Sequence, residues 1–286
     1  MIGVTGASGQ LGRLVLAALE TAGKSAEVVA IVRDPARVSA GAVTVRKGDY
    51  ADVAGLTAAF AGIDTLLLIS GNEIGQRSAQ HRNAIAAAKA AGVTRIVYTS
   101  LLRADRSTLS LAPEHLETEA MLKASGLAFT ILRNGWYTEN YTGQIGGVLA
   151  GGGVIGAAGA GRINSAPRAD YAAAAVAVLT GAGHDGKTYE LAGDEGWTLA
   201  DYAAAIAAAT GRDIAYHDLP VADYAAKLEG FGLPAPVAQM LAGWEGEIAK
   251  GVLASDDRSL SALIGRPTVP MAETLRHALA AEGALA

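Results

Sequence analysis

The stretch GASGQLG near the start of the chain places glycines at positions 6, 9 and 12. An apolar run precedes it and a helix-forming run follows, the setting in which a glycine-rich turn binds a dinucleotide pyrophosphate. Gly6 permits a sharp turn, Gly9 lets the backbone approach a phosphate, and Gly12 allows close helix packing. The amino end of the helix adds free N–H groups and partial positive charge. The predicted pyrophosphate site is Gly6, Ala7, Ser8, Gly9, Gln10 and Leu11; a tight turn without a ligand is the alternative.

The residue after the second apolar run indicates which dinucleotide binds. In such folds an acidic residue there binds the 2′-hydroxyl of NAD, whereas an arginine accommodates the 2′-phosphate of NADP. Here Arg33 follows VVAIV, with Asp34 next. A charge-assisted hydrogen bond contributes about 1.5–3 kcal/mol, so Arg33 favours NADPH on the order of tenfold to a hundredfold. A solvated arginine paired with Asp34 is the alternative.

The ends of the next two apolar runs carry further candidates. Asp49 and Tyr50 follow the third run, where an adenine can lie, although Asp49 or Asp52 can equally cap a helix. Ile69 and Ser70 end the fourth run. Ligands bind at the carboxyl ends of strands in parallel sheets, so all four positions are predicted to face the cofactor.

These candidates must be positioned by alternating strands and helices. Apolar runs predict strands over 1–5, 27–32, 43–47, 65–69, 95–99 and 127–132, and helices over 11–22, 53–60, 79–91 and 113–124. Such alternation with short links is typical of an α/β fold with a doubly wound parallel sheet, a Rossmann domain. TLLLI is apolar throughout, which indicates a strand covered on both faces.

After residue 134 this rhythm breaks. The glycine-rich segment 143–161 is predicted to be flexible or kinked, and helices return over 170–180 and 199–209 with a strand at YELAG between them. We expect a Rossmann domain over 1–135, to which elements near 163–193 return. A smaller, mostly helical substrate-binding cap is expected over 136–286.

The composition excludes several classes of protein and of functional site. The 286 residues are 51% hydrophobic and 18% charged with net charge −5, which indicates a globular protein and argues against a nucleic-acid partner. The chain has no cysteine, so disulfides, thiolate catalysis and cysteine-ligated metals are excluded, and no metal site is predicted. No signal peptide or apolar stretch long enough for a membrane span is present, so a cytoplasmic protein is expected.

The glycine spacing G-x-x-G-x-x-G resembles that of short-chain dehydrogenases, which usually protonate a carbonyl with Tyr-x-x-x-Lys. Aligning Glu119 with the acidic residue usual in that helix puts His115 at the lysine position and Leu111 at the tyrosine position. The usual acid is therefore absent. A quinone needs it least, because the hydroquinone anion can take its proton from water. His115 is a candidate donor or orienting residue, or an ordinary helix histidine.

Longer motifs carry a more specific resemblance. They include AIVRDPARV, GQRSAQHRNAI, YTSLLRADRS, EHLETE, TILRNGWYTENY, IGAAGAGRINSAPRADYAAAA and YELAGDEGWTL. The chain resembles the NmrA-like atypical short-chain dehydrogenases, and among them the bacterial NADPH:quinone oxidoreductases, over nearly its whole length. The resemblance implies further cofactor contacts from Gly75, Gln80, His81, Arg82, Tyr137, Thr138, Glu139, Asn140, Tyr141, Thr142 and Arg168.

The resemblance also implies roles near the nicotinamide. Asn140 would hold the carboxamide or a quinone oxygen, while Trp136, Tyr137 and Tyr141 would form a flat wall for a ring. Alternatively, these aromatic residues seal the joint between the domains. Residues 80–82 can equally be a solvated helix start, and Arg168 can pair with Asp170.

The expected function is therefore transfer of a hydride from NADPH to a quinone, without metal or flavin, by a monomer or homodimer. Two alternatives stay open. NmrA-type proteins include NADP-binding redox sensors, and the missing acid suits them equally well. The substrate can also be another conjugated electrophile, such as a triphenylmethane dye or a phenylpropanoid.

Overall fold

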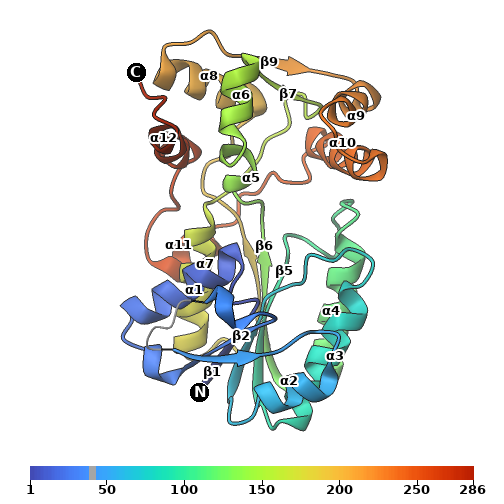
Figure 1. The fold of residues 1–286 in the computed structure, drawn as a ribbon, viewed down its shortest axis with the longest axis vertical. Helices are drawn as coiled ribbons and strands as arrows, with labels where there is room; N and C mark the ends of the chain where they lie inside the picture. The colour runs from blue at the N-terminus through green and yellow to red at the C-terminus, as the bar shows by residue number, and fades with distance from the viewer. Residues whose placement is uncertain (39–42) are drawn as a thin grey trace.

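The computed structural model describes residues 1–38 and 43–286. Its main sheet has seven parallel strands in the order β3-β2-β1-β4-β5-β6-β8 (Figure 1). The strands are β1 (Ile2–Thr5), β2 (Val28–Val32), β3 (Thr44–Lys47), β4 (Thr65–Leu68), β5 (Arg95–Leu101), β6 (Ala128–Asn134) and β8 (Thr188–Leu191). This order is that of a Rossmann fold, so the predicted fold class is confirmed.

Helices cover both faces of this sheet. One face carries α1 (Gln10–Thr21), α7 (Arg168–Thr180) and α11 (Ser259–Ile264); the other carries α2 (Val53–Ala59), α3 (Arg77–Ala90) and α4 (Ala112–Ala124). Leu67 packs into the core beneath α1 and α7, whereas Leu66 and Leu68 pack into the opposite core. A strand buried on both faces has to be apolar throughout, which explains the run TLLLI.

Strands β5 and β6 are each two residues longer at their carboxyl ends than their sequence patterns predict. Ser100 pairs with Arg133 and Leu101 with Asn134 in the extended ladder. Arg133 is tolerated there because its Nε and Nη2 donate hydrogen bonds of 2.9 and 2.8 Å to the carboxylate of Glu119. The carboxylate aligned above with a family acid is thus a buried partner of Arg133.

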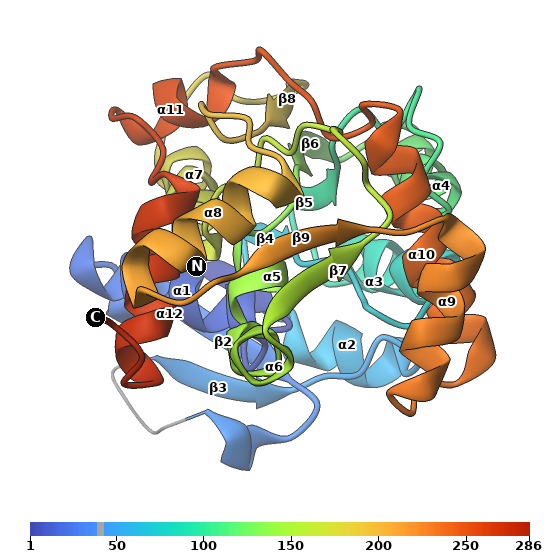
Figure 2. The same ribbon diagram turned by 90° about the horizontal axis from the view of Figure 1, so that it is seen from above.

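A second layer lies beyond the carboxyl ends of the strands, and we call it the cap layer (Figure 2). It consists of α5 (Glu139–Thr142), α6 (Ile145–Gly151), β7 (Gly153–Gly156), α8 (Leu199–Thr210), β9 (Ala215–Asp218), α9 (Val221–Gly230), α10 (Ala235–Ala249) and α12 (Met271–Ala281). Short helical turns η1 (Ser25–Glu27) and η2 (Pro35–Arg37) flank β2. In residues 1–38 and 43–286, no helix is both long and apolar enough to span a membrane.

The glycine-rich segment 143–161 is more regular than its composition predicts. It forms α6 and then β7, which pairs in parallel with β9 from Gly153–Ala215 to Gly156–Asp218. Gly152, with φ +72°, ends α6 in the left-handed conformation and turns the chain directly into the strand. Between these cap elements the chain returns to the sheet, where α7 packs on α1 and β8 pairs with β6.

Candidate dinucleotide and substrate site

The turn between β1 and α1 is built for close approach. Gly6 has φ +59°, and Gly9 donates a hydrogen bond of 2.9 Å to the Gly6 carbonyl. A Cβ on Gly12 would lie 2.7 Å from the Ala7 Cα and collide with the Gly6 carbonyl oxygen. No side chain from the described residues caps α1, so the first N–H groups of the helix can receive an anion. This cradle fits a pyrophosphate.

Arg33 extends from the carboxyl end of β2, and its side chain is 65% exposed. Its Nη1 lies 3.0 Å from Oε1 of Glu73, whose Oε2 accepts a 2.8 Å hydrogen bond from Gln80. Asp34 instead caps η2 by accepting from Ala36. Arg33 is therefore paired with Glu73, which lies 40 positions away in the sequence, and not with the neighbouring Asp34.

Tyr50 ties two neighbouring strands together. Its hydroxyl lies 2.6 Å from Oγ1 of Thr5 and 2.7 Å from the carbonyl of Ile69, and burial raises its pKa well above the usual value. The Asp49 carboxylate accepts from Ala51 within the turn. Tyr50 therefore fixes the strand ends from inside, and its hydroxyl is occupied by the protein.

Asp52 and Ser70 are also held in place by hydrogen bonds within the protein. Asp52 caps α2 through Gly55, as the capping alternative anticipated for that residue. Ser70 N donates 2.9 Å to Thr99 Oγ1, which links the ends of β4 and β5. The carboxyl edge beside the glycine turn is thus rigidly connected.

His81 is completely buried and holds the chain that leaves β4. Its Nε2 accepts from Gly71 N at 3.0 Å, and its Nδ1 bonds Thr118 Oγ1 at 2.9 Å. Both ring nitrogens are used inside the protein, so His81 positions residues 71–76 and has no free nitrogen for a cofactor. Gln80 is buried on the same helix, whereas Arg82 is exposed on its outer side.

Gly75 lies at the end of the same segment. It has φ +87°, and its N–H donates 3.1 Å to Oε1 of Glu114 in α4. The N–H of Arg77 donates to the same oxygen, and its guanidinium bonds the other. Glu114 and Arg77 therefore clamp the segment that carries Glu73 beside Arg33.

His115 lies on the buried face of α4, against Tyr98 of β5. Its Nδ1 is 2.7 Å from the Tyr98 hydroxyl, and only 5% of the residue is exposed. Burial, with the charge of Arg77, lowers its pKa to about 3. A neutral buried imidazole bonded to Tyr98 is poorly placed to give a proton to a substrate, which argues against the donor role.

Residues after β6 gather around Arg168. The guanidinium carbon lies 4.4 Å from the centre of the Tyr137 ring, and Nη2 donates 2.9 Å to Oδ1 of Asn140. The carboxylate of Glu139 accepts from the Arg168 backbone N–H at 2.9 and 3.1 Å and so caps α7. Asp170 instead bonds Arg266 at 2.6 Å, so the alternative pairing of Arg168 with Asp170 is not what the structure shows.

The neighbouring side chains turn towards the cap layer. Thr138 Oγ1 lies 2.8 Å from Ser165 Oγ, and Thr142 is buried. Tyr141 packs edge-on against Trp197 with ring centres 4.9 Å apart, and Trp136 does the same with Trp244 at 5.9 Å. Trp136, which follows β6, thus joins the sheet to the cap layer, as the sealing alternative anticipated, whereas Tyr141 packs within the cap layer.

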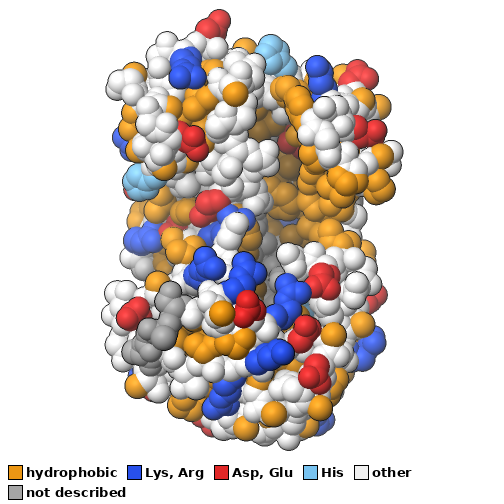
Figure 3. All heavy atoms as spheres, viewed as in Figure 1, with side chains coloured by type: hydrophobic (Ala, Val, Ile, Leu, Met, Phe, Trp, Pro, Cys, Tyr) orange, Lys and Arg blue, Asp and Glu red, His pale blue; other side chains and the backbone are white. Residues whose placement is uncertain are grey.

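A hollow separates the layers above this region, and hydrophobic side chains line much of it (Figure 3). Arginine and lysine side chains gather on the sheet layer below it. At the end of β6, Oδ1 of Asn134 is buried and has no partner in the described part of the chain, while its Nδ2 donates 3.4 Å to the Tyr137 hydroxyl. An unpaired acceptor beside Tyr137, together with the glycine cradle, fits a dinucleotide that brings its own donors.

Residues 6–182 match the model of the NAD(P)H-binding family. This chain belongs to that family. It is 53% identical to Quinone oxidoreductase 2 of Escherichia coli (strain K12), over 97% of this chain and 98% of that protein. The family assignment agrees with the glycine cradle as a cofactor site.

Solved structures extend this comparison. The Escherichia coli NADPH-dependent quinone oxidoreductase complexed with NADPH superimposes with a TM-score of 0.94 at 52% identity, over 97% of this chain and 99% of that chain. The Citrobacter sp. triphenylmethane reductase gives 0.93 at 35% identity, over 98% and 99%. The negative transcriptional regulator NmrA, at 16% identity and 0.77 over 98% and 95%, shows the shared fold alone.

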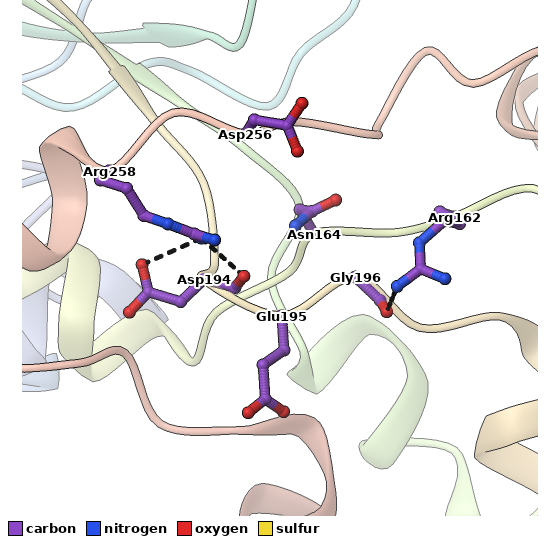
Figure 4. A pocket seen from close by; sticks show the side chains of 7 residues that line it. All are labelled: Arg162, Asn164, Asp194, Glu195, Gly196, Asp256 and Arg258. Carbon is purple, nitrogen blue, oxygen red and sulfur yellow. Dashed lines mark hydrogen bonds and ion pairs between the residues drawn. The ribbon is translucent and has the colours of Figure 1, made fainter.

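A separate polar pocket of about 460 Å³ contains none of the predicted cofactor residues (Figure 4). It is lined by Arg162, Asn164, Asp194, Glu195, Gly196, Asp256 and Arg258. Both arginines are already bonded, Arg258 to Asp194 and Arg162 to the Gly196 carbonyl, while Glu195 points away from the other side chains. The polar side chains of this pocket therefore hold neighbouring loops together through hydrogen bonds.

Sequence patterns missed the residues that support the site from a distance. Glu73, Glu114 and Ser165 contact predicted site residues from other elements. Glu114 and Ser165 were detectable only as members of the motifs EHLETE and IGAAGAGRINSAPRADYAAAA, and Glu73 stands in a loop whose pattern identifies no partner. Such pairings become visible only when the strands are assembled.

Proposed function

We propose that this protein transfers a hydride from NADPH to a quinone and releases the hydroquinone. The observation that carries the proposal is Arg33 at the carboxyl end of β2, beside a glycine cradle shaped for a pyrophosphate. Relatives alike over nearly their full length support the quinone as acceptor, since one is named for quinone oxidation–reduction and was solved with NADPH.

In this proposal NADPH supplies the hydride, and the protein supplies binding and orientation. The turn 6–11 binds the pyrophosphate, and Arg33 exchanges Glu73 for the 2′-phosphate. Asn140, fixed by Arg168, presents its side-chain NH₂ group to the carboxamide or to a quinone oxygen. Tyr137 borders the ring of the cofactor. Holding donor and acceptor together provides most of the rate enhancement.

The position of a carbonyl-reducing tyrosine is occupied by Leu111, which directly precedes α4. An unactivated ketone needs a positioned general acid at that place, whereas a quinone accepts hydride without one. This difference in acceptor chemistry favours a quinone over a simple alcohol or ketone as substrate.

The test compares oxidation of NADPH and NADH with simple 1,4-benzoquinone added or omitted. We expect quinone-dependent turnover with NADPH preferred about tenfold or more, because Arg33 binds a phosphate only NADPH carries. Tight NADP⁺ binding without any turnover would instead support a redox sensor. A triphenylmethane dye belongs in the same panel, because the dye reductase of Citrobacter shares 35% identity and the whole fold.

A further inference from the structure

The ion pair between Arg33 and Glu73 joins segments on opposite sides of the glycine turn. Arg33 follows β2 and Glu73 lies in the segment after β4, and these two strands pair with β1 from opposite sides. The turn that begins at Gly6 leaves β1 between them, and a Cβ on Gly6 would lie 3.5 Å from the Ile69 Cβ. The pair therefore links the two sides of the turn that a dinucleotide pyrophosphate would occupy.

Two donors hold the Glu73 carboxylate in this place. Its Oε1 lies 3.0 Å from Nη1 of Arg33, and its Oε2 accepts a hydrogen bond of 2.8 Å from Nε2 of Gln80. Gln80 is buried in α3. On either side of Glu73, the N–H groups of Gly71 and Gly75 donate to side chains of α3 and α4. The carboxylate is thus positioned on Arg33 before any cofactor arrives.

Glu73 occupies the place on Arg33 that a phosphate oxygen would take. Carboxylate and phosphate oxygens are alternative acceptors for the same guanidinium N–H groups. In NADPH the ribose 2′ oxygen is bonded to the phosphorus of that phosphate, whereas in NADH the same oxygen is a hydroxyl group. An acidic side chain is the usual acceptor for this hydroxyl. An arginine beside a carboxylate therefore offers one recognition group to each cofactor.

We propose that Glu73 sets the balance between NADPH and NADH. The inference rests on the cofactor site of the proposed function and adds a residue that discriminates between the cofactors. When NADPH binds, the 2′-phosphate displaces the carboxylate from Arg33, and the two negative charges repel each other. When NADH binds, the carboxylate stays on Arg33 and accepts a hydrogen bond from the 2′-hydroxyl. Glu73 therefore opposes the first cofactor and favours the second.

The exposure of the pair determines the size of this effect. The Arg33 and Glu73 side chains are 65% and 41% exposed, so the ion pair is screened by water and the carboxylate can turn into solvent. A phosphate monoester carries more negative charge than a carboxylate near neutral pH, so it wins the exchange at Arg33. Glu73 should therefore reduce the preference for NADPH without reversing it.

The test measures the dissociation constants of NADPH and NADH by cofactor fluorescence for the wild type and Glu73→Gln. Glutamine can still accept from Gln80 but carries no charge. We expect NADPH to bind about two- to fivefold more tightly and NADH about threefold more weakly. The ratio of the two constants should therefore change about tenfold in favour of NADPH. Shifts in the same direction for both cofactors, or no shift for either, would overturn the inference.

The matched control is Glu117→Gln, at an exposed glutamate of α4. It removes the same charge from the chain and should change neither dissociation constant. If it reproduces the two opposite shifts, the effect comes from net charge and not from contact with the cofactor, and the inference fails.

Fragments of the cofactors locate the effect. The nucleotides 2′,5′-ADP and 5′-AMP carry the adenosine half with and without the 2′-phosphate, and calorimetry measures their binding in the absence of a nicotinamide. Glu73→Gln should bind 2′,5′-ADP more tightly and 5′-AMP more weakly than the wild type does. Shifts that appear with the whole cofactors but not with these fragments would exclude a contact at the 2′ position.

A second background separates competition from simple repulsion. In Arg33→Ala no guanidinium remains for which carboxylate and phosphate compete, so adding Glu73→Gln should improve NADPH binding less than it does in the wild type. An equal gain in both backgrounds would overturn the exchange at Arg33.

Quinone turnover distinguishes this inference from the proposed function. If the wild type oxidises NADPH with benzoquinone but Glu73→Gln leaves both affinities unchanged, only the inference fails. If the wild type binds both cofactors without any turnover, the proposed function fails, and the binding constants still decide the role of Glu73.

Discussion

Arg168 donates a hydrogen bond of 2.9 Å to the side-chain oxygen of Asn140, across 28 positions of the chain. Because that oxygen is occupied, the orientation of the amide is determined and its NH₂ group remains the donor available to a ligand. The same guanidinium lies over Tyr137, so one cation orders two predicted cofactor contacts.

Replacing this cation tests that arrangement. Arg168→Met should lower kcat with benzoquinone about tenfold or more, since a hydrogen bond to a charged group contributes about 1.5–3 kcal/mol. Steady-state rates at saturating NADPH provide the measurement, with Arg276→Met on the exposed side of α12 as control. Wild-type kcat in the folded variant would show that Asn140 needs no such support.

Arg33 should distinguish the two nicotinamide cofactors. Arg33→Ala is expected to weaken NADPH binding about tenfold to a hundredfold while changing NADH binding little, because only NADPH carries the 2′-phosphate. Fluorescence titration with both cofactors measures this. Arg37→Ala, an exposed arginine of η2, should leave both affinities unchanged. Equal losses for both cofactors from Arg33→Ala would refute the phosphate role.

The glycine cradle should tolerate no added methyl group at its centre. In Gly12→Ala the new Cβ meets backbone atoms of Gly6 and Ala7, which cannot yield as a side chain can. We expect lower thermal stability and at least tenfold weaker NADPH binding. Gly147→Ala in α6 is the matched control, because nothing lies within 4 Å of its Cβ position. The thermal stability of this control should be unchanged or slightly higher, because alanine has a higher helix propensity than glycine.

His115 should matter for stability more than for chemistry. His115→Ala leaves the buried Tyr98 hydroxyl without its partner and should cost about 1–3 kcal/mol of unfolding free energy. Turnover per folded molecule should stay close to wild type. Denaturant unfolding and benzoquinone kinetics on the same preparation separate the two effects. A near-total loss of kcat in folded protein would instead make His115 a required acid.

The same histidine predicts a pH effect of definite sign. Its folded pKa is about 3, below the usual 6.5, so the unfolded chain binds more protons between these values. Stability should therefore fall as pH drops from about 6.5 towards 3, and the fall should be smaller in His115→Ala. His81, with a pKa also lowered to about 3, should preserve part of the acid sensitivity. Unfolding curves at pH 7 and pH 5 test both statements.

The sequence by itself determined the features that depend on neighbouring residues. The glycine spacing at positions 6, 9 and 12 predicted the turn, because backbone sterics act locally. Alternating apolar and helical runs predicted the parallel sheet, since strands buried on both faces must be apolar. Arg33 was predicted at the end of the second strand by counting along that pattern, which is why its place needed no tertiary information.

Only the tertiary structure decided which side chains meet. Arg33 pairs with Glu73 and Arg168 with Asn140, while the adjacent Asp34 and nearby Asp170 bond elsewhere. These pairs join residues at least 28 positions apart, and their choice depends on how strands and helices pack. The same packing buries His115 against Tyr98. Burial changes the protonation chemistry of these groups, and burial is a property of the assembled fold.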